Sequence, residues 1–421
     1  MSINSGIPLF KDKKVFSNFI GIKEKKAAIN VIDNGELSGF SASANSDFFG
    51  GKEVLSLEKK FKKKFKSKYA VAFNSATSAI YASLMSLKLN PGDEVITTPY
   101  TMHATVASIL QCNCIPVFAD VSNDDYNLDP ISVKKTITKK TKAIILVNLF
   151  GQPGRLQELK AIAKKYKIFL IEDNSQSPGA KTPLGLAGSV GDAGIFSFNR
   201  HKTIQSGEGG VLITNSKNIY FNSCLIRNHG ESVVREWKVK DIRNTVGQNL
   251  RMTELIAAIA NVQLSRLNEL NGIRIKRAGW YKKYLQKYPF LKFQEIKKGY
   301  TNVFYLLPIL YEEKFLGISR EKFCKIISSE GIIFRPGYRV PLYNEPFYKN
   351  KTCFGSYGWP YSFNKKNLKN KINLKNFGNV QQLQSKKLIL VQHLSTNITE
   401  KDVLKLTKVL DEIVQYKEKF K

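Results

Sequence analysis

The 421-residue sequence predicts an α/β protein with a central, mostly parallel sheet. Two observations support this fold class. Short apolar runs alternate with segments of helical periodicity from about residue 51 to residue 290, which is typical of β–α–β units. The apolar runs also lack the alternation of polar and apolar residues that a half-exposed strand has. Helices are therefore expected to cover both faces of the sheet.

The elements follow in a regular order after a mixed N-terminal segment, residues 1–50. A helix is expected first, at 54–65, and strands and helices then alternate. Strands are expected at 68–75, 94–99, 115–121, 143–150, 167–173, 193–198 and 209–215. Helices are expected at 76–87, 105–112, 130–138, 155–166 and 219–228.

A long helical stretch, 252–288, is expected to end a large domain, to which we assign residues 51–290. Residues 291–421 are assigned to a smaller C-terminal α/β domain. A strand at 304–311, a helix at 320–331 and a strand at 332–338 are expected in this domain.

The chain is strongly basic, with 66 Lys and Arg against 34 Asp and Glu and a formal net charge of +32. A basic nucleic-acid-binding protein is therefore one alternative. The basic residues are spread along the whole chain, however, and no nucleic-acid-binding motif stands out. A solvated basic surface is the favoured interpretation, and no nucleic-acid partner is expected.

Five scattered cysteines have neither a zinc nor a redox spacing, so we expect no metal site and a reducing compartment, the cytoplasm. The N-terminus lacks the apolar core of a signal peptide. No apolar run approaches the ~20 residues of a membrane span, so no membrane partner is expected.

Polar residues follow the ends of several predicted strands, where parallel α/β sheets bind ligands. Residues 74–78 (NSATS) come at the start of a helix, where free backbone N–H groups and the helix dipole favour a phosphate. An ordinary Ser/Thr helix cap is the alternative. Glu172 and Asp173 end the buried strand 167–173, and an acid at such a position needs a partner or a chemical task.

Lys202 lies between the strand AGIFSF and the turn GEGG at 207–210. A lysine near a phosphate-binding turn and a buried acid is the set of groups that pyridoxal 5′-phosphate needs. The lysine forms a Schiff base, the acid keeps the pyridine nitrogen protonated, and hydroxyls and helix amides hold the phosphate. Neither a Walker A motif nor G-x-G-x-x-G is present, which argues against nucleotide hydrolysis and dehydrogenation.

With these residues the chain resembles the DegT/StrS family of sugar aminotransferases. The matching motifs are SAT (75–77), TMHAT (101–105), IEDNSQ (171–176), GD to GEGG (191–210), RNHG (227–230) and GQNLRMTE (247–254). The likeness covers about residues 35–270 and is weak in the C-terminal third. It implies the fold type I of pyridoxal-phosphate enzymes, similar to aspartate aminotransferase, with a central sheet of the seven-stranded type.

The resemblance also implies roles for single residues. Lys202 would bind the cofactor covalently and later carry protons, Asp173 would pair with the pyridine nitrogen, and Gln176 would contact the ring hydroxyl. The phosphate would be bound by Ala76, Thr77 and Ser197.

Met102 stands where the family has an aromatic residue against the cofactor ring. A thioether can also cover a π face, and the neighbouring His103 is an alternative for this role. Candidate substrate contacts are His229, Arg251 and Tyr338, which lie in the segments RNHG, GQNLR and GYRVPLY.

Asn249 matches a residue that completes the phosphate site of the neighbouring subunit in this family, so a homodimer with shared active sites is implied. The alternative is local, because an asparagine before MTELIAAI could cap the helix that begins there.

The implied reaction transfers an amino group from L-glutamate to a keto sugar, most often nucleotide-linked, in amino-sugar and surface-polysaccharide biosynthesis. Pyridoxamine 5′-phosphate would carry the amine between the two half-reactions. Two related reactions stay open, a cyclitol (inosose) aminotransferase and a sugar dehydratase that uses the same cofactor. Dehydratases on this scaffold have histidine in place of the lysine. His201 is adjacent, but Lys202 occupies the family position.

Overall fold

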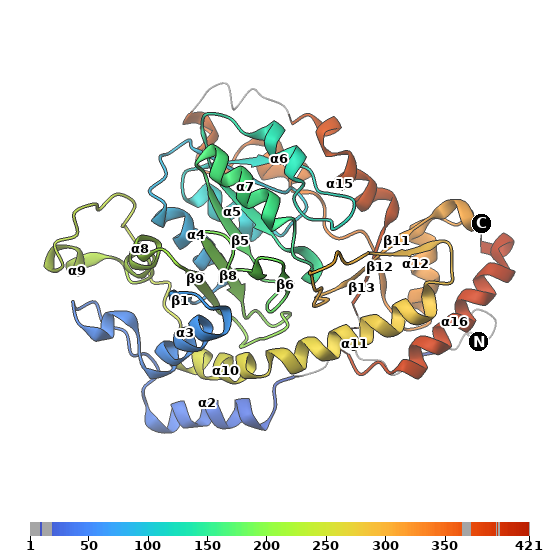
Figure 1. The fold of residues 1–421 in the computed structure, drawn as a ribbon, viewed down its shortest axis with the longest axis horizontal. Helices are drawn as coiled ribbons and strands as arrows, with labels where there is room; N and C mark the ends of the chain where they lie inside the picture. Colours follow the sequence, from blue (N-terminus) through green and yellow to red (C-terminus); the bar gives the residue numbers. More distant parts are fainter. Residues whose placement is uncertain (1–8, 11–18, 364–371, 393, 395, 421) are drawn as a thin grey trace.

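A seven-stranded sheet lies at the centre of the molecule, in the order β1-β9-β8-β5-β4-β2-β3 (Figure 1). The computed structural model describes residues 9–10, 19–363, 372–392, 394 and 396–420. The strands are β1 (Tyr69–Phe73), β2 (Glu94–Thr97), β3 (Ile115–Phe118), β4 (Thr141–Val147), β5 (Phe169–Asp173), β8 (Ala193–Ser197) and β9 (Gly210–Thr214). Neighbours from β8 to β3 are parallel, whereas β9 runs antiparallel to β1 and β8. The predicted mostly parallel sheet is confirmed.

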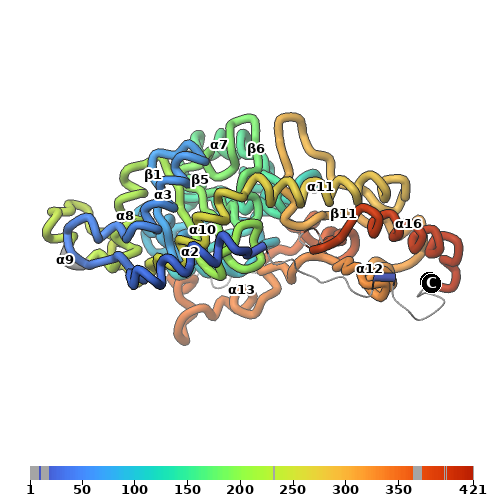
Figure 2. The backbone as a smooth tube through the Cα atoms, turned by 90° about the horizontal axis from the view of Figure 1, so that it is seen from below, coloured from blue at the N-terminus to red at the C-terminus, as the bar shows by residue number. Residues whose placement is uncertain are grey.

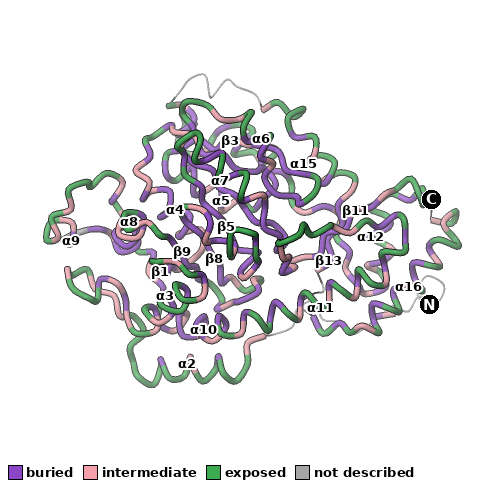
Figure 3. Tube along the Cα trace, viewed as in Figure 1, coloured by how far each residue is buried: buried purple, intermediate pink, exposed green. Residues whose placement is uncertain are grey.

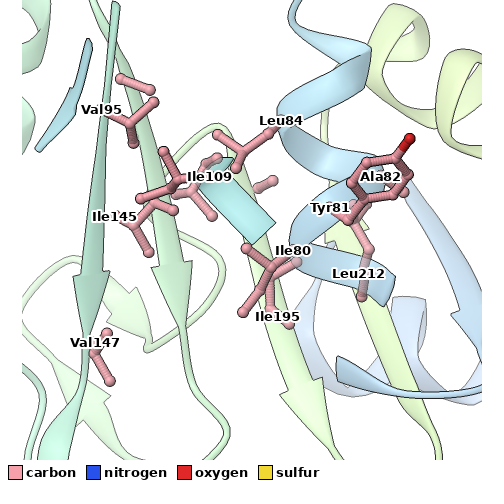
Figure 4. Close-up of a cluster of buried hydrophobic side chains, with 14 of the residues drawn as sticks. Ile80, Tyr81, Ala82, Leu84, Val95, Ile109, Ile145, Val147, Ile195 and Leu212 are labelled. Atoms are coloured by element: carbon pink, nitrogen blue, oxygen red, sulfur yellow. The ribbon is translucent and has the colours of Figure 1, made fainter. Parts of the chain in front are cut away.

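Helices cover both faces of this sheet. One layer contains α4 (Ala76–Ser86), α5 (His103–Gln111) and α8 (Lys217–Arg227), and the other contains α3 (Lys52–Phe65), α6 (Pro130–Thr136), α7 (Leu156–Tyr166) and α10 (Glu254–Ser265). Alternate residues of one strand enter different cores: Ile145 and Val147 pack with α4, and Ile144 and Leu146 pack with α7. Figure 4 shows the α4 side, where Ile80 and Leu84 face the sheet. The expected apolar strands without alternation follow from this double covering.

The predicted helical stretch 252–288 is two helices. Thr253 caps α10, which ends at Ser265, and α11 (Leu267–Leu285) begins after Arg266. The long α11 extends from the central sheet to the C-terminal part of the chain (Figure 2). A second sheet lies there, antiparallel in the order β10-β11-β13-β12.

The second sheet and its helices form a separate apolar core. Its strands are β10 (Leu291–Phe293), β11 (Leu307–Tyr311), β12 (Phe334–Pro336) and β13 (Leu388–Val391), and α11, α12 (Arg320–Ser329) and α16 (Glu400–Gln415) pack against them. The predicted strand 304–311 begins only at Leu307, because Phe304 has a positive φ of 50° that breaks extended structure. The domain boundary at residue 290 stays a prediction.

Smaller elements complete the chain. Within the N-terminal segment, α2 (Ile22–Asn34) packs along α10 below the sheet (Figure 1). Other short elements include β6 (Lys181–Thr182), β7 (Gly185–Leu186), α9 (Glu231–Glu236), α13 (Pro346–Asn350), α15 (Gly378–Gln382) and the π-helical turn η7 (Leu383–Lys387).

Burial is concentrated in the central strands, and the outer helices expose one side (Figure 3). Among the residues that the structure describes, we find no helix with the length and apolar character needed to cross a bilayer.

Candidate active site

A pocket of about 380 Å³ lies at the C-terminal ends of the parallel strands. Its lining includes two groups of residues. We call the first the strand-end wall; its members end or follow β1, β5 and β8 and are Ala76, Thr77, Asp173, Gln176, Ser197 and Lys202. We call the second the C-terminal wall; its members are Tyr305, Tyr338 and Arg339. Seven predicted cofactor residues, the six of the first wall and Met102, therefore lie in one pocket, together with Tyr338.

The turn between β1 and α4 has the features of a phosphate site. The N–H groups of Ala76 and Thr77 belong to the first helical turn, where the backbone has no intrahelical partner. The Ser75 hydroxyl caps the helix by accepting from the Ser78 N–H at 3.1 Å. The alternative of a simple cap is therefore correct for Ser75, while Ala76 and Thr77 line the pocket.

The glycines of GEGG let a neighbouring strand lie against this turn. A Cβ atom on Gly210 would lie 2.5 Å from the Ala76 nitrogen, closer than any real contact. Gly209 forms a bridge with Ser75 and has a φ of 125°, which glycine adopts without strain. The two glycines thus let β9 lie in contact with the turn between β1 and α4.

Lys202 extends from the loop between β8 and β9 into the pocket. Its backbone N–H donates to the Asn199 carbonyl at 2.8 Å, and its ammonium lies 4.9 Å from the centre of the Tyr305 ring. Burial lowers the pKa of Lys202, the neighbouring Tyr338 and Asp173 oppose this shift, and the positive charge of Arg339 adds to it. A lower pKa raises the fraction of neutral amine, the form that can act as a nucleophile or base.

The adjacent acids Glu172 and Asp173 have different surroundings and different roles. Glu172 is fully buried and accepts three backbone N–H groups, from Gly188, Val190 and Gly191, at 2.7–2.8 Å. It therefore anchors the loop before β8. Asp173 lines the pocket and accepts from the Ser175 N–H at 3.0 Å. Of the two carboxylates that end β5, only Asp173 lines the pocket and is placed to meet a ligand.

Gln176 joins the two walls. The Phe150 N–H donates to Gln176 Oε1 at 2.8 Å, which fixes the amide so that Nε2 is the donor. Nε2 donates to the Tyr338 hydroxyl at 3.1 Å. Because Nε2 carries two hydrogens, one remains for a ligand oxygen. The Tyr338 oxygen accepts from Gln176, so its own proton is directed elsewhere.

Gln384 of the π-helical turn η7 accepts a hydrogen bond from the backbone of Tyr338 and so helps to position it. Its Oε1 accepts from the Tyr338 N–H at 2.9 Å and from the Tyr100 hydroxyl at 3.1 Å. Gly337 has a φ of 65°, and a Cβ atom there would lie 2.8 Å from the Gln384 amide. Single-turn π-helices occur often at functional sites, and here the turn supports the pocket.

Met102 lies at the mouth of the pocket with 48% of its surface exposed. The alternative of His103 against the ring stays a prediction, and His103 is engaged elsewhere in this structure. His103 Nδ1 lies 3.0 Å from the Tyr348 hydroxyl of α13, and the His103 ring packs edge-on against Phe347.

The predicted residues Asn249, His229 and Arg251 do not line the pocket of their own chain. They lie on two paired segments: Asn249 bridges to Asn228, the residue before His229, and Arg251 donates to Asn228 Oδ1 at 2.7 Å. Asn249 is exposed, and the alternative that it caps the next helix is wrong, because Thr253 caps α10.

Tyr305 and Arg339 were missed by sequence reasoning. Tyr305 lies within the predicted strand 304–311, but the strand begins two residues later, at Leu307. Arg339 directly follows Tyr338 in GYRVPLY, and this adjacency to a predicted substrate contact is the sequence signal that could have identified it. Asn199 and Glu208, whose side chains are joined by a hydrogen bond of 2.9 Å, also line the pocket and flank Lys202 in the sequence.

The donor set fits pyridoxal 5′-phosphate. A helix N-terminus with free N–H groups suits the phosphate, a strand-end carboxylate suits a ring nitrogen, and a lysine of lowered pKa suits the aldehyde. Fold and pocket together define the class: this is a pyridoxal-phosphate-dependent aminotransferase.

The chain belongs to the DegT/DnrJ/EryC1/StrS aminotransferase family, whose model matches residues 31–363. The resemblance seen in the sequence is thereby confirmed. GDP-perosamine synthase of Vibrio cholerae is 31% identical over 336 residues, which are 79% of this chain and 86% of that protein. Spore coat polysaccharide biosynthesis protein SpsC of Bacillus subtilis is 29% identical over 321 residues, 75% of this chain and 82% of that protein.

Solved structures agree with the fold. An aminotransferase from Psychrobacter cryohalolentis has a TM-score of 0.80 and 25% identity, and the match covers 96% of this chain and 100% of that one. GDP-4-keto-6-deoxy-D-mannose-3-dehydratase of E. coli, solved with bound hydrated pyridoxal phosphate, has a TM-score of 0.74 and 25% identity over 95% and 99% of the two chains.

Proposed function

We propose that this enzyme transfers an amino group from L-glutamate to a keto sugar, most often nucleotide-linked, in amino-sugar or surface-polysaccharide biosynthesis. The observation that carries the proposal is the convergence of Lys202, Asp173 and the α4 N-terminus on one pocket. The curated relatives named above support the sugar as the acceptor, because GDP-perosamine synthase and a spore coat polysaccharide protein are among them.

Each residue of the strand-end wall has a proposed role. Ala76 and Thr77 offer backbone N–H groups to the phosphate, and the Ser197 hydroxyl adds a further donor. Asp173 holds the ring nitrogen protonated, and Gln176 offers its second N–H to the ring oxygen. Met102 covers one face of the ring.

The bound cofactor supplies an electron sink that makes the α-carbon of an attached amino acid acidic. Lys202 Nζ is the base that removes this α-proton and the acid that returns it on the other side of the reaction. Its lowered pKa favours the neutral amine that the first task needs. Tyr305 of the C-terminal wall packs against the amine, whose nitrogen lies 4.9 Å from the centre of the ring.

We further propose a homodimer in which Asn249 of each chain completes the phosphate site of the other. Two observations support it. Asn249 is exposed and is not a helix cap, and it does not line the pocket of its own chain. His229 and Arg251, on the same surface, are the proposed substrate contacts across the interface.

Mixing two inactive variants tests the shared site. In a heterodimer of Lys202→Ala and Asn249→Ala chains, one site holds both intact residues. After full exchange of subunits, about a quarter of the wild-type activity should return for a symmetric dimer. A monomer by sedimentation, or no recovery after proven exchange, contradicts the shared site.

The acceptor is tested with the pyridoxamine form of the enzyme. A panel of keto sugars, with and without nucleotide, and an inosose should be scored for return of the pyridoxal absorbance. Return with a keto sugar supports the proposal, and return with the inosose alone makes the enzyme a cyclitol aminotransferase. Loss of a sugar hydroxyl without transfer of nitrogen would identify a dehydratase, in which His201 rather than Lys202 is the working base.

We place the enzyme in the cytoplasm. All five cysteines are unpaired in the structure, which supports a reducing compartment.

A further inference from the structure

Arg339 is a charged residue of the pocket that the proposed reaction has not yet used. It follows β12 and lines the pocket beside Tyr338. Its side chain is exposed, and it has no hydrogen bond or ion pair with any residue that the structure describes. A guanidinium with five N–H donors and no protein partner is available to a ligand in the pocket.

The backbone below Arg339 is fixed while its side chain is free. Gly337 donates to the Leu388 carbonyl at 2.8 Å, and Tyr338 is held at both its N–H and its hydroxyl by Gln384 and Gln176. The backbone of Arg339 is therefore held in a defined position in the C-terminal wall. Its long side chain can still turn toward a bound anion.

The other charged residues discussed for the pocket already have partners or roles, whereas Arg339 can bind an anionic substrate. Lys202 is committed to the cofactor, and Asp173 to the ring nitrogen, under the proposed function. Glu208 accepts from Asn199 at 2.9 Å. The Arg339 charge also contributes, after burial, to the lowered pKa of Lys202, so the two cations interact across the pocket. A bound anion between them would relieve this repulsion.

We propose that Arg339 binds a carboxylate of the amino donor, L-glutamate. The inference rests on the proposed function and names the residue that selects its donor. A guanidinium pairs with a carboxylate through two parallel hydrogen bonds, which gives both affinity and orientation. A carboxylate suits this position better than the phosphates of a nucleotide-linked sugar. The donor's α-carboxylate is attached to the reacting carbon, whereas those phosphates are separated from it by the width of a sugar ring.

Single-turnover measurements on the loaded enzyme test this assignment. The pyridoxal absorbance is followed after mixing with increasing L-glutamate for wild type, Arg339→Gln and Arg339→Lys. Arg335→Gln is the matched control, because Arg335 is an exposed arginine of β12 outside the pocket. We expect Arg339→Gln to raise the half-saturating concentration of L-glutamate by about 10-fold or more, as loss of a charged hydrogen-bond partner does. Arg339→Lys should recover part of this loss, and Arg335→Gln should match wild type.

A comparison of donors identifies the carboxylate. An equal loss for L-alanine and L-glutamate assigns the α-carboxylate, and a loss for L-glutamate alone assigns the γ-carboxylate; either supports the proposal. The rate of the second half-reaction, in which the keto sugar accepts the amine, should change little. If Arg339→Gln weakens only the sugar half-reaction, the partner is a phosphate and the proposal is wrong.

Two failures remain distinguishable. If wild type responds to no amino donor although the cofactor is bound, the proposed function fails. If wild type responds and Arg339→Gln has the same half-saturating concentration, only the role of Arg339 is overturned. All variants should bind the cofactor with the wild-type absorbance, which excludes a folding defect.

Discussion

The strand-end wall and the C-terminal wall of the pocket are held by different kinds of contact. Asp173 is a strand residue, and its carbonyl accepts from the Asn148 N–H within the parallel sheet at 3.0 Å. Tyr338 depends on the side chains of Gln176 and Gln384. A backbone ladder tolerates most side-chain changes, whereas a side-chain bridge is lost with one substitution. We therefore expect the strand-end wall to carry the chemistry and the C-terminal wall to adjust it.

The largest effect should come from Lys202→Ala, which removes the residue at the centre of the strand-end wall. Loss of the nucleophile and of the general base should lower turnover by at least ~1,000-fold. Borohydride reduction and peptide mapping should place the pyridoxyl group on Lys202. His201→Ala is the control and should keep turnover within a few-fold of wild type. A pyridoxyl group on another lysine would show that the wrong residue has been chosen.

Asp173→Asn should have the next largest effect. The amide can still accept from the Ser175 N–H, so the loop should keep its shape, but it cannot hold a ring nitrogen protonated. We expect turnover to fall by about 100-fold or more, as when one preorganised electrostatic partner is removed from an active site, while some cofactor stays bound.

The adjacent Glu172→Gln is a matched control for this change. Glu172 serves three backbone N–H groups and does not line the pocket. Its variant should lose thermal stability and keep the turnover of the folded fraction. If the two variants lose activity equally, the division of tasks between these neighbouring acids is incorrect.

The two walls also differ in how far the sequence predicts them. Asp173, Ser197 and the α4 N-terminus follow apolar strands, and the ends of parallel strands meet at one edge of a sheet. Their convergence could therefore be predicted from local pattern. Tyr305 precedes β11 and Arg339 follows β12, so the packing of the second sheet brings both to the pocket, and Gln384 holds Tyr338 next to Arg339. These contacts join residues far apart in the chain. No local pattern encodes such contacts.

The fold follows the same division. All strands of the central sheet were predicted near their observed positions, because each is a continuous apolar run. The break at Arg266 between α10 and α11 was missed, since no glycine or proline marks it in the sequence. The helix α2 was also missed; its first turn is stabilised by the distant Arg266, which pairs with Glu24 at 2.8 Å.

Gln384→Ala tests the C-terminal wall and should have a smaller effect. Tyr338 and Tyr100 would each lose an acceptor, so the Tyr338 ring would be less well positioned. A hydrogen bond of this kind contributes about 1 kcal/mol, which corresponds to a roughly 5-fold loss of kcat/KM. Cofactor affinity should not change, because the strand-end wall is intact.

Two further variants serve as a test of the Tyr338 hydroxyl and as a control for Gln384→Ala. Tyr338→Phe keeps the ring and removes the hydroxyl, and it should reproduce the loss if the hydroxyl is the group that matters. Gln381→Ala, on the neighbouring helix α15, removes an exposed side chain that donates to the Leu374 carbonyl, and it should be silent. A loss of cofactor affinity in Gln384→Ala would mean that the two walls are not independent.

The smallest effect concerns the stability of the cofactor-free protein. Burial lowers the pKa of Lys202 in the folded state, so the unfolded chain holds this proton to higher pH than the folded chain. Where the unfolded state binds more protons, stability rises with pH. Lys202 therefore destabilises the cofactor-free protein most at pH values below the pKa of Lys202 in the folded state. The penalty disappears as the pH approaches the ordinary lysine pKa of about 10.4.

Lys202→Met should raise the melting temperature by roughly 1–3 °C near neutral pH, and by less as the pH increases. Lys181→Met, at an exposed lysine of β6, controls for the substitution itself. Melting curves of the two variants at several pH values measure the difference, and a gain that grows with pH would reverse the sign assigned to Lys202.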